Sequence, residues 1–255
     1  MGEGYQERRH QGRLNSITGP TMTTSQTLHL LSGGAAQGLV GTLEPQFLAD
    51  QGCSVSGGFG AVGVMKDRLL SGEPCDVVVL TDALITQLTA SGHLVAGGAR
   101  ALGVVQTGIA VKAGEPAPHV NDADALKAAL LAATGVYFPD AIQSTAGIHF
   151  MKVLKALGID AALGDRLKTF PNGATAMGAM AQSLQTGLIG CTQMTEILHI
   201  PGVTWVAPLP PEFELATVYT AAVCTRAAHA ELAMGLVDLL SRAESGSLRQ
   251  AAGFA

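Results

Sequence analysis

Four short segments combine glycine or hydroxyl side chains with the predicted start of a helix. Such a turn exposes backbone N–H groups at the positive end of the helix dipole, where an anion can bind. The alternative is an ordinary glycine turn or a capping hydroxyl without a ligand. The four segments contain Ser32, Gly33, Gly34 and Ala35; Gly58, Phe59, Gly60 and Ala61; Ser144, Thr145 and Ala146; and Gln193 and Thr195. Their residue types indicate either anion contacts or plain helix starts.

His149 lies about one turn into the third of these helices. An imidazole titrates near neutral pH, so it can act as a general acid or base beside an anion. A buried or capping histidine is the alternative. Glu196 and Glu214 are further candidate bases, whereas Lys66 and Arg68 are expected on a solvent-exposed helix face.

Several catalytic and cofactor motifs are missing from the sequence. It contains no G-x-S-x-G nucleophile elbow, no Walker phosphate loop and no H-E-x-x-H zinc motif. Cys53, Cys75, Cys191 and Cys224 are far apart without C-x-x-C spacing. They are therefore predicted to be small buried side chains, not zinc ligands or a redox dithiol. No organic or metal cofactor is expected.

Composition excludes several classes of protein. Hydrophobic residues make up 47% and charged residues 14% of the 255 residues, which excludes a largely disordered chain. A net charge of -5 leaves no basic surface for nucleic acid. An uninterrupted apolar stretch of about 20 residues is also missing, so no membrane insertion is expected.

The first residues of the chain are polar. Residues 1–26 lack the run of about 7–15 apolar residues that a secretory signal needs. We therefore expect a disordered N-terminal tail over 1–26 and a cytoplasmic protein.

Short apolar runs of strand type alternate with helical patterns. The clearest strands are 76–80, 102–111 and 215–224, and the longest helical patterns are 122–133, 144–157 and 227–243. Pro45 is expected to kink or end the first helix. Continuous apolar strands are typical of parallel sheets that are buried on both faces. We therefore expect an α/β fold with mainly parallel sheets, in which ligands bind beyond the carboxyl ends of the strands.

The order of these features resembles the type II periplasmic-binding-protein family, in its molybdate-binding and extracellular solute-binding branch. The resemblance rests on LLSGGA at 30–35, LSGEPCDVV at 70–78, TAGIHF at 145–150, PLP at 208–210 and TVYTAAV at 217–223. It implies two lobes with a ligand cleft between them. Lobe 1 would comprise residues 27–106 completed by 216–255, and lobe 2 residues 107–215, with crossings near 106–108 and 215–219.

The resemblance also implies a function. Oxyanion binders of this family use helix starts, so the four segments would hold a small anion in the cleft. The chain departs from a molybdate binder at Gly60–Gly63, which lacks a hydroxyl, and at Gln193 and Thr195, where a tyrosine is usual. Fewer hydroxyls favour a larger ligand than a tetrahedral oxyanion, such as a di- or tricarboxylate. An exported solute-binding protein of this kind would have an ABC transporter permease as its partner.

The resemblance extends to aconitate isomerases, which gives a second hypothesis. These enzymes shift a double bond by moving a proton between allylic carbons, which requires an acid/base and anion-binding groups but no cofactor. In this alternative His149 carries the proton, while Ser32, Thr145 and the glycine-rich turns hold the carboxylates. The sequence leaves solute binding and isomerisation both open.

Overall fold

The computed structural model describes residue 1 and residues 26–255. Within 26–255 the strands form one curled sheet in the order β2-β1-β3-β9-β4-β7-β5-β6, and β8 pairs with β4. The strands are β1 (Gln26–Gly33), β2 (Cys53–Gly60), β3 (Val77–Thr81), β4 (Arg100–Lys112), β5 (Gly135–Pro139), β6 (Leu167–Phe170), β7 (Leu188–Gln193), β8 (Val203–Pro208) and β9 (Ala216–Val223). Apart from residues 1 and 26, the predicted tail lies outside the described residues.

Helices cover the sheet. They are α1 (Gln37–Gln51), α2 (Val62–Leu70), α3 (Asp82–Ala90), α4 (Ala123–Ala132), α5 (Thr145–Ala156), α6 (Asp160–Leu163), α7 (Gly173–Gln182), α8 (Met194–His199), α9 (Ala230–Ser241) and α10 (Gly246–Ala251). Short 3-10 turns lie at η1 (Gly34–Ala36), η2 (Gly164–Arg166), η3 (Pro211–Phe213) and η4 (Ala243–Ser245). Among the described helices, none has the length and apolarity needed to cross a bilayer.

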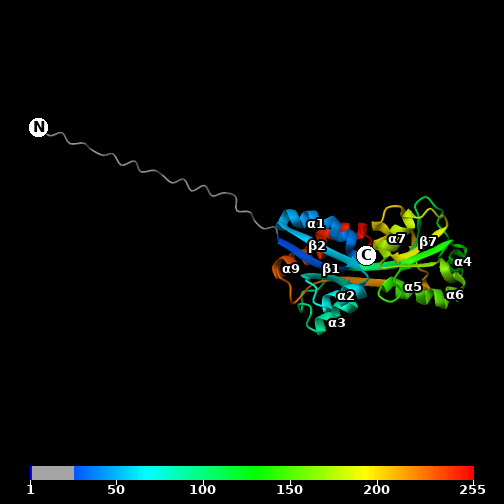
Figure 1. The fold of residues 1–255 in the computed structure, drawn as a ribbon, viewed down its shortest axis with the longest axis horizontal. Coiled ribbons are helices and arrows are strands. Elements are labelled where there is room, and N and C mark those ends of the chain that lie inside the picture. Colours follow the sequence, from blue (N-terminus) through cyan, green and yellow to red (C-terminus); the bar gives the residue numbers. More distant parts are fainter. Residues whose placement is uncertain (2–25) are drawn as a thin grey trace.

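The buried apolar side chains divide into separate cores. One core draws its buried residues from 28–105 and 219–254, and the other two draw theirs from 109–209. Figure 1 shows α1, α2, α3 and α9 around one end of the molecule and α4 to α7 around the other. We call these parts lobe 1 and lobe 2. The chain thus begins in lobe 1, builds lobe 2 and returns to lobe 1.

The sheet is mixed, because β4 and β9 run antiparallel to each other and to each of their other neighbours. β1 pairs in parallel with β2 and β3, and β5 pairs in parallel with β6 and β7. Each antiparallel pairing, namely β3–β9, β4–β7, β4–β8 and β4–β9, involves β4 or β9. The predicted α/β fold is confirmed, and its parallel parts lie within the lobes.

The two connections between the lobes run side by side. The backbone N–H of Thr107 in β4 donates to the Leu215 carbonyl at 2.9 Å. The Thr107 carbonyl accepts from the N–H of Leu209 at 3.1 Å. The crossings implied by the resemblance fall in this region, while the lobe boundaries at 106/107 and 215/216 stay a prediction.

Two local expectations change in the structure. The glycines at 57, 58 and 60 do not form a loop, because β2 pairs with β1 from Cys53 to Gly60. Pro45 does not end α1, which continues to Gln51. Pro45 and Gly41 both lie on the exposed face of α1, where water can bond to the carbonyl that the proline leaves unpaired.

Candidate functional site

The first two predicted segments meet at the carboxyl ends of β1 and β2. Ser32 lies opposite Phe59, and Gly33 lies opposite Gly60. A Cβ added to Gly33 would lie 3.1 Å from Cε1 of Tyr219. Ser32 is fully buried, and its hydroxyl donates to the Gly33 carbonyl at 2.8 Å. The two segments therefore form a closely packed edge of lobe 1 at the carboxyl ends of β1 and β2, where there is little room for side chains beside Gly33.

The third segment faces this edge from lobe 2. The backbone N–H of Gly63, in the first turn of α2, donates to the Gln143 carbonyl at 3.1 Å. Gln143 directly precedes Ser144, the N-cap residue of α5. A cavity of about 380 Å³, lined by Val64 of lobe 1 and by Asp140 and Gln143 of lobe 2, opens beside this contact. The starts of α2 and α5 therefore approach each other across an interlobe cleft.

Neither helix start carries a side-chain cap. Ala61 caps α2 and Ser144 caps α5, and neither side chain bonds to the first turn. No acidic residue lies in the first turn of either helix. Ser144 is 8% exposed, so its hydroxyl and the nearby amides are largely shielded from water. Both helix starts are suited to an anion.

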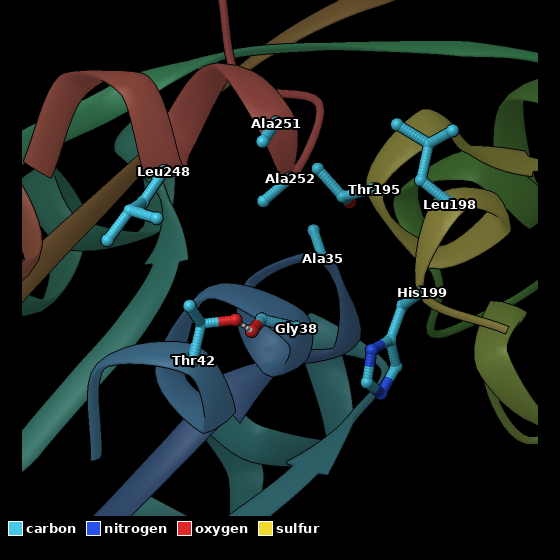
Figure 2. A pocket seen from close by; sticks show the side chains of 9 residues that line it. All are labelled: Ala35, Gly38, Thr42, Thr195, Leu198, His199, Leu248, Ala251 and Ala252. Carbon is cyan, nitrogen blue, oxygen red and sulfur yellow. Dashed lines mark hydrogen bonds between the residues drawn. The ribbon is translucent and has the colours of Figure 1, made fainter. Parts of the chain in front are cut away.

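The fourth segment is divided between two places. Gln193 ends β7 and lies opposite Thr107. Thr195 instead lies in α8 and lines a cavity of about 200 Å³ between lobe 2 and lobe 1. Figure 2 shows Thr195, Leu198 and His199 facing residues of α1 and of the C-terminal helix across this cavity. Gln193 therefore lies by the connections, apart from the cavity that Thr195 lines.

Four buried side chains have polar atoms without a hydrogen-bond partner within 26–255, namely Thr107, Gln193, Thr195 and Thr217. Both amide atoms of Gln193 and the hydroxyl of Thr107 find no hydrogen bond within 26–255. Gln193 is 3% exposed and Thr107 is 1% exposed. Residues paired across adjacent strands share a face of the sheet. The next pair on this face, Ile109 and Cys191, packs into the core that contains α5 residues, so Gln193 and Thr107 face the α5 side.

Glu196 is a functional candidate that the sequence marked only as a further base. It is 5% exposed, and the Thr192 hydroxyl donates to its Oε2 at 2.5 Å. A Cβ added to Gly34 would overlap Oε1, and one added to Gly173 would overlap Oε2. Burial raises the pKa of Glu196, while Thr192 and the backbone amides of Gly173, Ala174 and Gln193 oppose this rise. The carboxylate therefore lies between a turn of lobe 1 and a helix start of lobe 2.

Tyr219 lies close to this carboxylate. It is 3% exposed, and burial followed by the negative charge of Glu196 raises the pKa of its phenol. Tyr219 therefore stays protonated at physiological pH and offers a hydroxyl instead of a charge.

His149 is anchored to a connecting segment. Its Nε2 lies 2.8 Å from the carbonyl oxygen of Phe213 in η3. Because a carbonyl only accepts, Nε2 carries the proton in this bond. The bond gives His149 a structural task between α5 and the interlobe connection. Its role as a proton carrier stays a prediction.

Gly58 and Gly60 of the second segment and Gly63 of α2 have a spacing that also occurs in dinucleotide sites. Gly58, Gly60 and Gly63 form G-x-G-x-x-G between a strand and a helix, as in dinucleotide sites. Side chains already occupy the space beside them: Arg68 lies against Gly58, Met65 against Gly60 and Gln143 against Gly63. The Arg68 guanidinium is paired with Glu73 and so is not directed into the cleft. These glycines allow the three side chains to pack closely against the backbone.

The described part of the chain offers no obvious metal site. Within it, no three His, Cys, Asp or Glu side chains lie close enough together to hold a metal ion.

Comparison with known proteins identifies relatives of this chain. An aconitate isomerase from Pseudomonas sp is 27% identical over 223 residues, which cover 84% of this chain and 82% of the relative. The periplasmic molybdate-binding protein of Azotobacter vinelandii superposes with a TM-score of 0.73 at 17% identity, covering 89% of this chain and 98% of that one. The sulfate-binding protein SubI of Mycobacterium tuberculosis gives 0.69 at 17% identity, with 90% and 86% covered.

These solved structures confirm the two-lobed fold. The model of the bacterial extracellular solute-binding protein family matches residues 28–255, which is nearly all of the described chain. This chain belongs to the bacterial extracellular solute-binding protein family.

Proposed function

We propose that the cleft between the lobes binds a small organic anion, a di- or tricarboxylate. The observation that carries this proposal is the pair of buried, unpartnered side chains of Gln193 and Thr107 on the α5 side of the sheet. A buried polar group without a partner costs free energy, so such groups are retained where a ligand or ordered water completes them. The uncapped starts of α2 and α5 add backbone donors of the sign that an anion needs.

The size of the ligand follows from the number of separate donors. The starts of α2 and α5 come from different lobes, and the amide of Gln193 lies at a third position near the connections. Several carboxylates on one carbon skeleton can reach separate donors, whereas a single tetrahedral oxyanion presents all of its oxygens around one atom. The relatives named as molybdate- and sulfate-binding share the fold of this chain. Because the donors here are at separate positions, we propose that this chain binds a larger ligand than theirs.

A thermal-shift screen tests the proposal on the full chain. The panel contains molybdate, tungstate, sulfate, citrate, cis-aconitate and trans-aconitate. A ligand at 100 times its Kd stabilises the folded state by about 2.7 kcal/mol, which gives a clear shift. We expect a shift with the tricarboxylates. A response to molybdate, tungstate or sulfate alone would reject the carboxylate assignment, and no response at all would reject anion binding.

Two substitutions separate binding from folding. Gln193→Leu and Thr107→Val remove unpartnered polar atoms, so we expect the ligand-free protein to keep or gain thermal stability. The same variants should lose at least about tenfold in ligand affinity, since about 1.4 kcal/mol of lost contacts corresponds to that factor. Thr204→Val, at an exposed position of β8, is the matched control and should leave affinity unchanged. Loss of stability with unchanged affinity would assign both side chains to the fold alone.

Isomerisation is the second candidate function. The aconitate isomerase relative and the buried carboxylate of Glu196 favour it, because proton transfer needs a titratable group within the cleft. The test is to incubate the protein with cis- or trans-aconitate and to follow the other isomer by proton NMR. If turnover is seen and His149→Ala retains it, the base is not His149, and Glu196→Gln becomes the deciding variant.

A transporter partner follows from the binding function. We propose that an exported form of the chain delivers its ligand to an ABC transporter permease, in keeping with the extracellular family. Fractionation of the native host tests this proposal, because delivery to a permease requires export. Recovery of the protein only from the cytoplasm would reject delivery to a permease.

A further inference from the structure

The carboxylate of Glu196 is held in the way a bound anion would be. It is 5% exposed and accepts from the Thr192 hydroxyl at 2.5 Å. Its two oxygens face glycines of different lobes, Oε1 toward Gly34 and Oε2 toward Gly173, with no room for a Cβ at either position. The glycines thus leave the space that the carboxylate fills.

The donors around Glu196 come from the start of a ten-residue helix. The backbone amides of Gly173 and Ala174, in the first turn of α7, act on the carboxylate in the direction that stabilises its charged form. The side chain of Asn172, the N-cap residue of α7, accepts from the Thr175 amide at 2.8 Å. A second acceptor of the chain itself therefore satisfies a donor in this first turn. The start of α7 is therefore occupied by the protein's own acceptors.

We infer that Glu196 is an internal ligand, which fills an anion position at the start of α7 and thereby selects the solutes that the cleft accepts. This inference rests on the proposed function. While Glu196 is in place, a solute has to use the starts of α2 and α5 instead. In its ionised form, the Glu196 carboxylate disfavours compact dianions, which concentrate two charges in one group, more than carboxylates spread along a carbon skeleton. Glu196 thus favours organic carboxylates over molybdate or sulfate.

Chemical rescue tests the internal ligand. Glu196→Ala leaves the Thr192 hydroxyl and the α7 amides without their acceptor, so we expect its Tm to fall by about 3–6 °C. Formate or acetate should then restore Tm with saturation, because either fits the vacated position. Wild type and Glu231→Ala, an exposed first-turn glutamate of α9, should show no such response. Equal responses of all three proteins would overturn the inference.

A second variant covers the case in which Glu196→Ala does not fold. Glu196→Gln keeps the size of the side chain and removes its charge. We expect the ratio of sulfate or molybdate affinity to citrate affinity to rise at least about tenfold, and an unchanged ratio would overturn the selective role. If the wild type binds no anion, the proposed function fails, but rescue of Glu196→Ala by formate would still establish the internal ligand.

A separate observation concerns two cysteines at the opposite end of β3 from the cleft. Cys75 precedes β3 and Cys224 follows β9, and their sulfur atoms lie 3.6 Å apart. Cys75 is 8% exposed and Cys224 is 3% exposed. Both line a cavity of about 270 Å³ that also contains His93 and Arg226. The fold therefore brings together two free thiols that are far apart in the sequence.

We propose that Cys75 and Cys224 form a disulfide when a disulfide oxidant is supplied. Two S–H bonds break and one S–S bond forms, while oxidised glutathione takes up both electrons and both protons to give two glutathione thiols. The reaction passes through a mixed disulfide at one of the two cysteines, both of which line the cavity. The sulfur atoms need to approach by about 1.6 Å to reach bonding distance.

Mass spectrometry tests this pair directly. Oxidised glutathione at about pH 8.5 should remove two hydrogens from the folded chain and two of its four free thiols. Peptide mapping should link Cys75 to Cys224, and Cys53→Ser should react like wild type. Cys75→Ser should keep all of its remaining thiols or stop at a glutathione adduct. Denatured chain, which the same oxidant should oxidise, is the control for the reagent. If the folded wild type keeps all four free thiols while the denatured chain is oxidised, the proposal is overturned.

Discussion

Helices α5 and α7 begin in the same lobe, yet the first turn of α7 is capped by side chains and that of α5 is not. In α7 the side chain of Asn172 accepts from the Thr175 amide, and the Glu196 carboxylate lies against Gly173. In α5 the N-cap Ser144 makes no side-chain bond, and no acid follows it in the first turn. The chain therefore supplies acceptors for the start of α7 and no side-chain cap for the start of α5, where we propose that a ligand binds.

The largest expected effect comes from crowding the filled helix start. Gly173→Ala places a methyl group onto Glu196 and Thr192, so it should lower the free energy of unfolding by about 1–3 kcal/mol. Gly178→Ala makes the same change in the same helix with open space around it, and should raise stability by about 0.5–1 kcal/mol. Urea unfolding measures both. Equal effects at the two positions would show that the carboxylate does not occupy the start of α7.

A pH series on Glu196→Gln sharpens the same contrast. Burial raises the folded-state pKa of Glu196 above the unfolded value of about 4.3. The protonated side chain therefore adds stability that is fully present below the unfolded pKa and is lost as the pH rises through the folded pKa. Between those two pKa values wild type should lose about 1.4 kcal/mol per pH unit relative to the glutamine variant.

Urea unfolding from pH 4 to pH 8 measures this difference. A wild-type chain that gains stability relative to Glu196→Gln as the pH rises would contradict the raised pKa. Glu231→Gln is the control, because Glu231 is exposed and should give a nearly flat difference.

Removing the caps themselves gives a smaller effect. Asn172→Ala loses its bond to the Thr175 amide and should cost about 0.5–2 kcal/mol. Ser144→Ala loses no cap bond and should change stability by less than about 0.5 kcal/mol, while ligand affinity falls. Thermal unfolding and ligand titration of both variants provide the measurement. A larger stability cost for Ser144→Ala than for Asn172→Ala would break the comparison.

Much of the architecture could be predicted because the apolar patterns are strong. The run at 76–80 and the longer one at 102–111 correspond to β3 and β4, since all of their valines and leucines except Val104 are buried. The glycines of β2 were harder to predict, because they have little strand preference of their own. Pairing with β1 along the whole strand holds them extended, and that partner is remote in the sequence.

The candidate site was predictable only in part, for a similar reason. Helix starts can be located from local patterns, so Gly33 and Ser144 could be placed at helix starts from the sequence. Their contact with a ligand stays a prediction. The burial of Glu196 depends on Gly34 and Gly173, which are distant in the chain and reveal nothing by spacing. The bond from His149 to the Phe213 carbonyl is likewise a product of the assembled fold.

The position of β9 has a consequence for how the chain acquires its structure during synthesis. β9 is the last strand made, and it lies between β3 and β4 in the sheet. Lobe 1 therefore cannot close its sheet until β9 has left the ribosome, whereas the core residues of lobe 2 come from one continuous stretch, 109–209. We expect lobe 2 to fold first and the early strands of lobe 1 to wait with an open edge, which makes them the part most in need of a chaperone.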